Sequence, residues 1–452
     1  MRRPWKRPLA AGLLCAAAGA AAQAPAEGGQ AAPSSASAGP GGEWRLVAAH
    51  GSASSRGPLA AADRLAPGLA PPAGLSAAAD VELRHTLHLQ ARGLPLSLAA
   101  NAWLQGTAPE HRASRAAARF NELHLGADLG PWQASVGRKV VGWDVGYGFR
   151  PNDVVQQEAR RTLLATTPQG RPLAMLEHFG AEHALSAVWA NPQRWNKKTA
   201  AADQAGTPSS AEASADESAD ESAIALRGYR RFGALDAHGF ARHGRRTGAS
   251  LGAALSWVAT DELELHVSWR GLQRHEGWQI AAAAGASAQT TNPWRRVLRG
   301  GGATQWLAGA HWTGLGKQSV MVEAWHDGTA LPDGQWDDWQ HRNAALASAA
   351  PPLPAAAVAG NLAWQATPFD APNLRQDNLF LRLAWSPEPW QLSFDTLFMP
   401  ADRGRLHTLA VQWQGAAWRL QAAWRMSAGP AQALVVQLPT RRTLMLAAIH
   451  AF

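Results

Sequence analysis

The sequence predicts an all-β protein: a single antiparallel transmembrane β-barrel of about 18 strands, within a range of about 16–18. Three observations lead to this fold class: alternating apolar and polar segments, a regular succession of short and long connectors, and an N-terminus typical of exported chains. The alternation alone would also fit a soluble β-sandwich whose apolar faces pack inward. The connectors and the N-terminus favour the membrane barrel.

Residues 1–22 have the order of a secretory signal peptide. Four basic residues precede position 8, and an apolar, alanine-rich stretch follows over 9–22. That stretch is too short to span a bilayer comfortably as a helix, which argues against an uncleaved anchor. Ala20 and Ala22 satisfy the small-x-small rule, so we expect cleavage after Ala22 and a flexible periplasmic leader over 23–42.

Composition excludes several classes of protein. The only cysteine, Cys15, lies within the expected signal, so the mature chain has no disulfide, thiolate metal site or cysteine nucleophile. Leu14 precedes it where a lipoprotein would have a small residue, which disfavours a lipid anchor. The net charge of +8 loses four positive charges with the signal, and the remaining excess is too small to indicate nucleic acid as a partner.

Hydropathy and aromatic content leave the membrane barrel open. No apolar run after residue 22 approaches the length of about 18 residues that a transmembrane helix needs. Barrel strands carry only weak, alternating hydrophobicity, so a search for long apolar runs does not detect them. The 22 tryptophans and the low share of charged residues, 17%, are typical of barrels with aromatic side chains at both membrane interfaces.

Period-2 alternation is sharpest over 81–91, 261–270 and 417–426. In the second of these, the apolar face contains Leu263, Leu265, Val267 and Trp269, and the polar face contains Glu262, Glu264, His266 and Ser268. Such a period indicates strands, because successive side chains point to opposite faces. In a membrane barrel the apolar face meets lipid and the polar face lines the lumen.

Connectors of two lengths separate the expected strands, and short and long ones nearly always alternate. The short ones are 91–94, 129–131, 181–182, 233–234, 258–260, 314–316, 387–388 and 415–416. The long ones are 52–78, 106–117, 142–170, 192–222, 273–302, 328–375 and 427–440. Two connectors, 245–247 and 400–404, are short where a long one is due. Outer-membrane barrels have short periplasmic turns and longer extracellular loops, so we expect a barrel domain over 43–452 with both termini periplasmic.

The last expected strand, 441–452, alternates and ends in the aromatic Phe452. Here the chain resembles bacterial outer-membrane proteins in general, whose final strand ends in Phe and is read by the barrel-assembly machinery. The resemblance implies that Phe452 is the membrane-insertion signal and that this machinery is a partner. It also implies a location in the cell outer membrane, among its lipid and lipopolysaccharide. The alternative is a hydrophobic C-terminal strand of a soluble protein.

The run 132–154 leads from a strand into a glycine-rich entry to a long loop. It resembles the GR-Q/K-x-x-x-W-G-x-G stretch of porin-like outer-membrane channels, including alginate-export-type porins. The matching positions are Gly137, Arg138, Lys139, Trp143, Gly146, Phe149, Pro151 and Asp153. Asp144 replaces the usual glycine after the tryptophan. The resemblance implies that this segment folds inward or frames a constriction, and it implies no substrate; the alternative is a structural corner between strand and loop.

Charged residues on the polar faces are the candidate pore lining. They are Glu82, Arg84, Glu122, Asp128, Arg227, Glu262, Glu264, Arg270, Glu323, Arg382, Asp395, Arg419 and Arg425. Rings of one sign would set ion selectivity, but the signs are mixed, so many of these groups are expected to form ion pairs across strands. Arg419 and Arg425 could instead form a basic ladder that favours anionic solutes.

Other chemistry finds little support, so we expect no catalytic, cofactor-binding or metal site. The histidines form no H-E-x-x-H motif. Ser268 and His266 share a strand face with nearby acids, as a hydrolase would need, but no G-x-S-x-G elbow is present.

We expect a channel for passive passage of small polar or anionic solutes, with a homo-oligomer among its possible assemblies. The connectors 142–170 and 328–375 are long enough to cap or plug the lumen. One alternative is therefore a non-conducting structural or assembly barrel of a surface-polysaccharide or secretion system. An outer-membrane hydrolase is the other.

Overall fold

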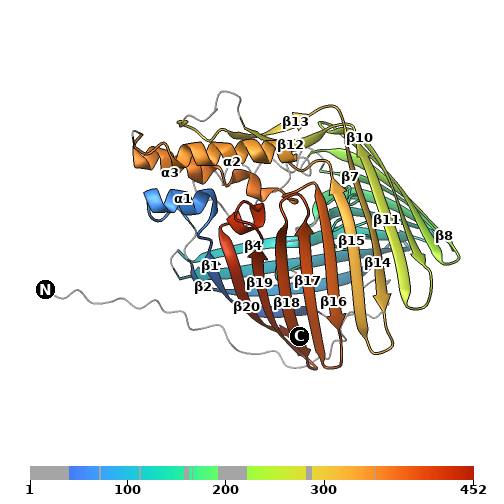
Figure 1. Ribbon diagram of the computed structural model, residues 1–452. Helices are drawn as coiled ribbons and strands as arrows, with labels where there is room; N and C mark the ends of the chain where they lie inside the picture. The colour runs from blue at the N-terminus through green and yellow to red at the C-terminus, as the bar shows by residue number, and fades with distance from the viewer. Residues whose placement is uncertain are drawn as a thin grey trace.

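Eighteen strands pair edge to edge in the computed structural model, which describes residues 40–70, 73–110, 113–156, 162–164, 166–191, 221–280, 288–351 and 353–452 (Figure 1). The barrel strands are β1 (Gly41–Ala53), β2 (Gly74–Ala91), β3 (Leu94–Pro109), β4 (Arg115–Leu129), β5 (Trp132–Lys139), β6 (Arg171–Phe179), β7 (His183–Ala190), β8 (Ala223–Phe232), β9 (Leu235–Gly244), β10 (Gly248–Val258), β11 (Leu263–Leu272), β14 (Ala303–Thr313), β15 (Gln318–Asp327), β16 (Asp377–Trp385), β17 (Trp390–Met399), β18 (Gly404–Gln414), β19 (Trp418–Ala428) and β20 (Thr440–Ala451). The expected signal peptide and most of the 192–222 loop lie outside the described residues.

The pairing closes the sheet into a barrel. Every barrel strand pairs antiparallel with the next one along the chain, and β20 returns to β1, with Trp44 opposite His450 and Leu46 opposite Ala448. A closed ring has no free strand edge, so its backbone N–H and C=O groups are paired all the way round. The prediction of an all-β antiparallel barrel with 18 strands is therefore confirmed.

The outside of the barrel is apolar, and alternation explains why. On β11, Val267 and Trp269 are 46% and 47% exposed, whereas His266 and Ser268 between them are 4% and 2% exposed. The same inversion recurs round the barrel, where outward leucine, valine and tryptophan side chains remain exposed. Apolar surface in water costs roughly 25 cal/mol per Å², so a continuous apolar exterior indicates contact with lipid rather than with water.

The short connectors lie at one end of the barrel and the long connectors lie at the other, as predicted. One end, the short-turn end, has connectors such as Arg92-Gly93, where both residues have positive φ of 52° and 79°, the conformation of a two-residue type I′ hairpin. The long-connector end carries every longer loop together with the short turns at 245–247 and 400–403. β1 begins at Gly41, slightly before the expected start at 43.

Three long connectors contain regular structure that we expected to be plain loop. The 54–73 connector holds helix α1 (Gly57–Leu65), and the connector between β11 and β14 holds the hairpin β12 (His275–Ile280) and β13 (Trp294–Arg299). The 328–376 connector holds α2 (Asp333–Ala347), α3 (Ala355–Trp364) and the 3-10 turn η2 (Thr367–Asp370). A further 3-10 turn, η3 (Leu434–Gln437), precedes β20.

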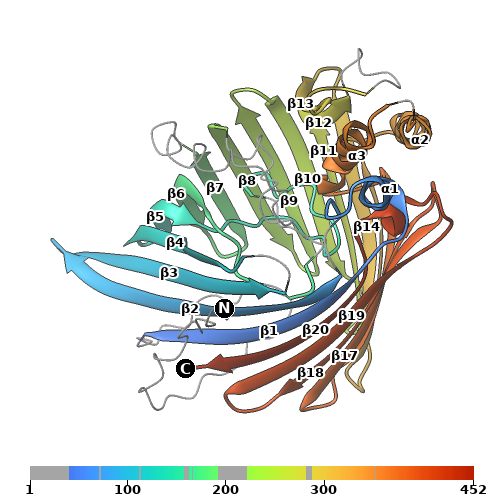
Figure 2. The ribbon, with the colours of Figure 1, turned by 90° about the vertical axis from the view of Figure 1, so that its left-hand side faces the viewer.

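The three helices gather at the long-connector end, beside β19 and β20 (Figures 1 and 2). Buried side chains from all three form one apolar cluster: Ala62, Leu346, Val358, Ala359 and Leu362. A second cluster joins Trp336 and Trp339 of α2 to Met399 of β17 and Leu434 of η3. Within the described residues, no helix is long and apolar enough to cross a membrane.

Candidate functional site

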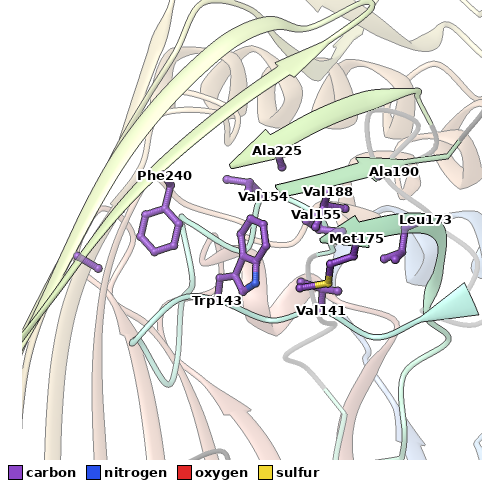
Figure 3. Close-up of a cluster of buried hydrophobic side chains, with 11 residues drawn as sticks. Val141, Trp143, Val154, Val155, Leu173, Met175, Val188, Ala190, Ala225 and Phe240 are labelled. Carbon is purple, nitrogen blue, oxygen red and sulfur yellow. The ribbon is translucent and has the colours of Figure 1, made fainter. Parts of the chain in front are cut away.

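The connector between β5 and β6 turns into the barrel and packs on its inner wall. Its Val141, Trp143, Val154 and Val155 are buried against inward side chains of β6–β10 (Figure 3). These wall side chains are also apolar: Leu173, Met175, Val188, Ala190, Ala225, Phe240 and Ala254. We call residues 140–156 the infolded segment. The segment covers an apolar stretch of wall that would otherwise face the lumen.

Two aspartates hold the infolded segment in its turn. Asp153 accepts hydrogen bonds from the backbone N–H groups of Trp143 at 2.8 Å and Asp144 at 3.0 Å. Asp144 in turn accepts from the N–H groups of Val145 and Asn152. The Asp144 that replaces the usual glycine therefore satisfies backbone donors that a buried non-regular segment would otherwise leave unpaired.

One anchor joins the infolded segment to β11. Ser268 donates to the Asp144 carboxylate at 2.7 Å, and Asn152 donates to the Ser268 hydroxyl oxygen at 2.8 Å. Arg270 donates to the carbonyl oxygen of Pro151 at 3.0 Å. Ser268 is thus buried and bonded to a carboxylate and an amide, while His266 bonds Glu323 instead at 3.0 Å. This arrangement does not bring Ser268 and His266 together as a nucleophile and its base.

A second anchor joins the infolded segment to β15. Glu323, fully buried, accepts the backbone N–H groups of Tyr147 at 2.7 Å and Gly148 at 2.5 Å. A Cβ at position 148 would lie 2.9 Å from that carboxylate, and one at Gly146 would lie 2.0 Å from the carbonyl oxygen of Phe149. Both glycines are therefore required by close approach, which explains the glycine-rich sequence of the motif.

A cavity of about 540 Å³ lies between the infolded segment and the wall made by β15–β19. Its lining includes Tyr147 and Gly148 on one side and inward side chains of the strands on the other. The charged lining residues among those described are Arg382, Asp395, Arg419 and Arg425, and the amides and hydroxyls include Gln391, Ser393, Thr408, Gln412 and Gln421. The lining therefore mixes polar groups with apolar side chains such as Phe380, Leu397 and Leu406, and its arginines outnumber its acids.

The cavity arginines make contacts across strands and to the connector. Arg382 lies 3.5 Å from Asp395, also contacts the Tyr147 hydroxyl, and its guanidinium is 5.2 Å from the centre of that ring. Arg425 donates to the Thr408 hydroxyl at 3.0 Å, and Arg419 lies 3.6 Å from Glu43. Arg382 and Arg419 thus form the ion pairs across strands that the mixed charges predicted, and the basic ladder of Arg419 and Arg425 stays a prediction.

The wall made by β1–β3 carries a cluster of polar side chains around Glu82. This fully buried carboxylate accepts from Arg84 at 2.8 Å, Asn101 at 2.7 Å and Thr167 at 2.6 Å, and it contacts Arg45. Thr167 belongs to the connector that contains the infolded segment, so the connector also bonds to this wall. Arg45 and Asn101 were not among the predicted pore-lining residues, although their inward positions on alternating strands were a signal for them.

Other predicted pore-lining residues are dispersed. Glu122 accepts the N–H of Val140 at 3.0 Å, Glu264 accepts the Ser256 hydroxyl at 2.6 Å, and Arg227 lies 3.2 Å from a ring nitrogen of His238. The expected place of Glu262 on the polar face of a strand is wrong. Glu262 lies in the turn before β11, bonded to Thr260, because that strand begins at Leu263.

Most of the glycine-rich motif lies at the infolded segment. Trp143, Phe149, Pro151 and Asp153 are buried there. Gly137 and Arg138 remain on β5. Arg138 pairs with the outward Leu123, so it lies on the outer side of the strand and donates to the carbonyl oxygen of Gly170 at 2.7 Å.

Phe452 ends the chain beside β1, where it exchanges two backbone hydrogen bonds with Gly42 at 2.9 and 3.0 Å. Its role as an insertion signal stays a prediction. Among the described residues, no group of three or more histidine, cysteine or acidic side chains could hold a metal ion.

Comparisons with known proteins give similarity at the level of fold only. No protein-family model matches the chain, and no curated protein matches it. A triple mutant of the Rhodopseudomonas blastica porin is similar with 8% identity and a TM-score of 0.40, over 92% of this chain and 99% of that one. OccAB4 of Acinetobacter baumannii is similar with 9% identity and a TM-score of 0.49, over 92% and 98%. Such low values assign neither a family nor a function, and the closed barrel is established by its own strand pairings.

Proposed function

We propose that this protein is an outer-membrane channel through which small polar solutes, preferentially anions, pass by diffusion. The observation that carries the proposal is the cavity between the infolded segment and β15–β19, whose described lining holds three arginines against one aspartate. A channel needs a continuous polar path and binding weak enough for solutes to leave. Amides and hydroxyls supply the path, and the arginines supply the preference for anions.

The membrane location rests on the barrel surface. Closed barrels are one of only two kinds of structure that can cross a bilayer with every backbone group satisfied. The exposed side chains on the outward positions are apolar, and tryptophans such as Trp385, Trp390 and Trp418 gather near the short-turn end. Aromatic belts of this kind mark the membrane interface. We assign the long-connector end to the cell exterior, because outer-membrane barrels have short periplasmic turns and longer extracellular loops.

Planar-bilayer recording of the purified full-length protein tests the proposal. The expected result is stepwise single-channel conductance with a reversal potential, under a potassium chloride gradient, on the side of anion preference. A correctly folded barrel that never conducts would overturn it. Heat-dependent mobility on a gel would show separately that the barrel is folded.

The helices at the long-connector end favour one second candidate, a non-conducting assembly barrel. Leu374, Val435 and Leu438, which belong to or border the apolar cluster beneath α2, also line the upper part of the cavity. A permanently closed cap would leave the lumen as a structural compartment. Stoichiometric capture of one partner from the cell envelope, together with absent conductance, would favour this candidate over the channel.

A further inference from the structure

The outside of the barrel carries two exposed arginines near the long-connector end. Side chains an even number of residues apart on a strand point to the same face. Arg405 lies four residues before the exposed Leu409 on β18, and Arg442 lies two residues before the exposed Leu444 on β20, so both arginines are on the outer face. One strand, β19, separates them. Arg405 pairs with Ala428 of β19 and Arg442 with Met426, so the two arginines are offset by two residues along the strands. With strands about 4.8 Å apart and about 3.3 Å per residue, their Cα atoms are roughly 12 Å apart.

Neither guanidinium has a carboxylate partner among the described residues. Arg405 lies 5.6 Å from the centre of the Phe398 ring. The acid closest to it along the chain, Asp402, is turned inward to Arg375 at 3.1 Å. His407 lies beside Arg405 and Arg442 on the outer face. It pairs with Met426 of β19, which in turn pairs with Arg442. We call Arg405 and Arg442 the outer cationic patch; its positive charge is not compensated by the protein.

The outer surface is hollowed nearer the middle of the same strands. The hollow has a volume of about 1130 Å³ and an almost entirely apolar lining, because small residues replace leucine there, among them Ala48, Ala77, Ala422 and Ala448. Ala422 lies four residues along β19 from the position that pairs with Arg442. At about 3.3 Å per residue, the patch and the hollow are roughly 13 Å apart along the strand.

We propose that the outer cationic patch and the hollow together hold one phosphorylated glycolipid of the outer leaflet, of the lipid A type. Arginine forms charge-assisted, bidentate hydrogen bonds with phosphate, and two unpaired arginines fit such a headgroup. An acyl chain extending along the strands would fill the hollow. The proposal rests on the proposed membrane location, and it is independent of conductance.

Native mass spectrometry of the full-length protein with added lipid A tests the site. Losing two charge-assisted contacts should weaken binding by about tenfold or more, so we expect that loss in the double variant Arg405→Gln, Arg442→Gln. Arg230→Gln is the matched control. Arg230 lies 5.0 Å from the Phe232 ring, on the outer face, but at the short-turn end that faces the other leaflet. Its loss should leave lipid A binding unchanged.

Three further arms separate the sources of binding. Ala422→Trp should fill the hollow and weaken lipid A binding while both arginines remain. Lipid A without phosphates should bind the wild type as weakly as phosphorylated lipid A binds the double variant. Inorganic phosphate should fail to displace the lipid. The proposal is overturned if the double variant binds lipid A like the wild type, if Arg230→Gln loses as much, or if phosphate alone displaces the lipid completely.

Discussion

Two stretches of the inner wall differ although both are built from the same alternating strands. On β6–β10 the inward side chains are apolar, for example Leu173, Val188 and Phe240, and the infolded segment covers them. On β16–β19 polar inward side chains, for example Gln421 and Arg425, alternate with apolar ones such as Leu397, and both border the cavity. The lumen is therefore divided: one wall belongs to a packed core, and the other borders the cavity.

The division has a physical cause. An apolar wall in a water-filled lumen would be unfavourable by roughly 25 cal/mol per Å², so covering it stabilises the barrel. The covering segment has no regular secondary structure over 141–150, and its backbone donors need other partners. Asp144, Asp153 and Glu323 supply these partners, so the acids hold the segment in place.

The largest effect should come from removing the centre of the covered wall. Trp143→Ala leaves a large cavity in the core, where such truncations cost about 3–5 kcal/mol. We expect a lower unfolding temperature and a higher, noisier conductance as the infolded segment loosens. Trp269→Ala, on the lipid face of β11, is the control and should change neither. Unchanged stability of the Trp143 variant would show that the segment is not part of the core.

Loss of an anchor should have a smaller effect. Glu323→Gln keeps one acceptor but leaves one of the N–H groups of Tyr147 and Gly148, or the His266 ring, unpaired, which costs about 1–3 kcal/mol. We expect increased open-channel noise with conductance raised less than in Trp143→Ala. In Glu264→Gln the amide oxygen can still accept the Ser256 hydroxyl, so this control should record like the wild type. Equal noise in both variants would contradict the anchoring role.

The polar wall should control ion preference more than conductance. In Arg419→Gln, Arg425→Gln the chloride-to-potassium permeability ratio should fall by about twofold, because the focusing positive charge is reduced. Arg227→Gln on β8, outside the cavity lining, should leave the reversal potential in place. The comparison fails if Arg227→Gln shifts the potential as far as the double variant does.

The smallest expected effect is on the pH dependence of stability, and it comes from Glu221, which lies just before β8. Burial raises the pKa of the Glu221 carboxyl, but hydrogen bonds from the Thr247 hydroxyl, the Arg246 N–H and Arg242 outweigh it, so the pKa lies below the usual value of 4.5. A lowered folded pKa gives stability that is present above the unfolded pKa and lost as pH falls through the folded one.

Melting between about pH 7 and about pH 3 should therefore be less steeply pH-dependent in Glu221→Gln than in the wild type. Glu262→Gln is a suitable control, because Glu262 is an exposed turn residue and a glutamine there can still accept the Thr260 hydroxyl. Identical pH profiles for the wild type and Glu221→Gln would contradict the assignment.

Much of this fold could be predicted from sequence because membrane barrels have simple local rules. Alternation located the strands, connector length located the two ends, and the run around Trp143 and Gly146 indicated an inward fold. The covered wall was missed. Its signal was present in 171–179, where Leu173 and Met175 make the expected polar face apolar, and alternation breaks down.

The remaining features depend on contacts between distant parts of the chain. Arg45 meets Glu82 only through the register of β1 on β2, and Glu323 meets Tyr147 across the lumen. The helices at 333–347 and 355–364 pack on each other, and the first also packs on Met399. Their apolar residues show only weak helical periodicity. No local pattern specifies such pairings.

Cysteine accessibility during recording tests the divided lumen most directly. Cys15 is the only native cysteine and lies in the expected signal, so single introduced cysteines report alone. Gln421→Cys places a thiol in the cavity, and Ala225→Cys places one on the covered wall, where the native side chain is 1% exposed. A charged thiol reagent should block current in the Gln421 variant and leave the Ala225 variant unaffected. Equal block in both variants, or block in Ala225→Cys alone, would contradict a solute path along β16–β19.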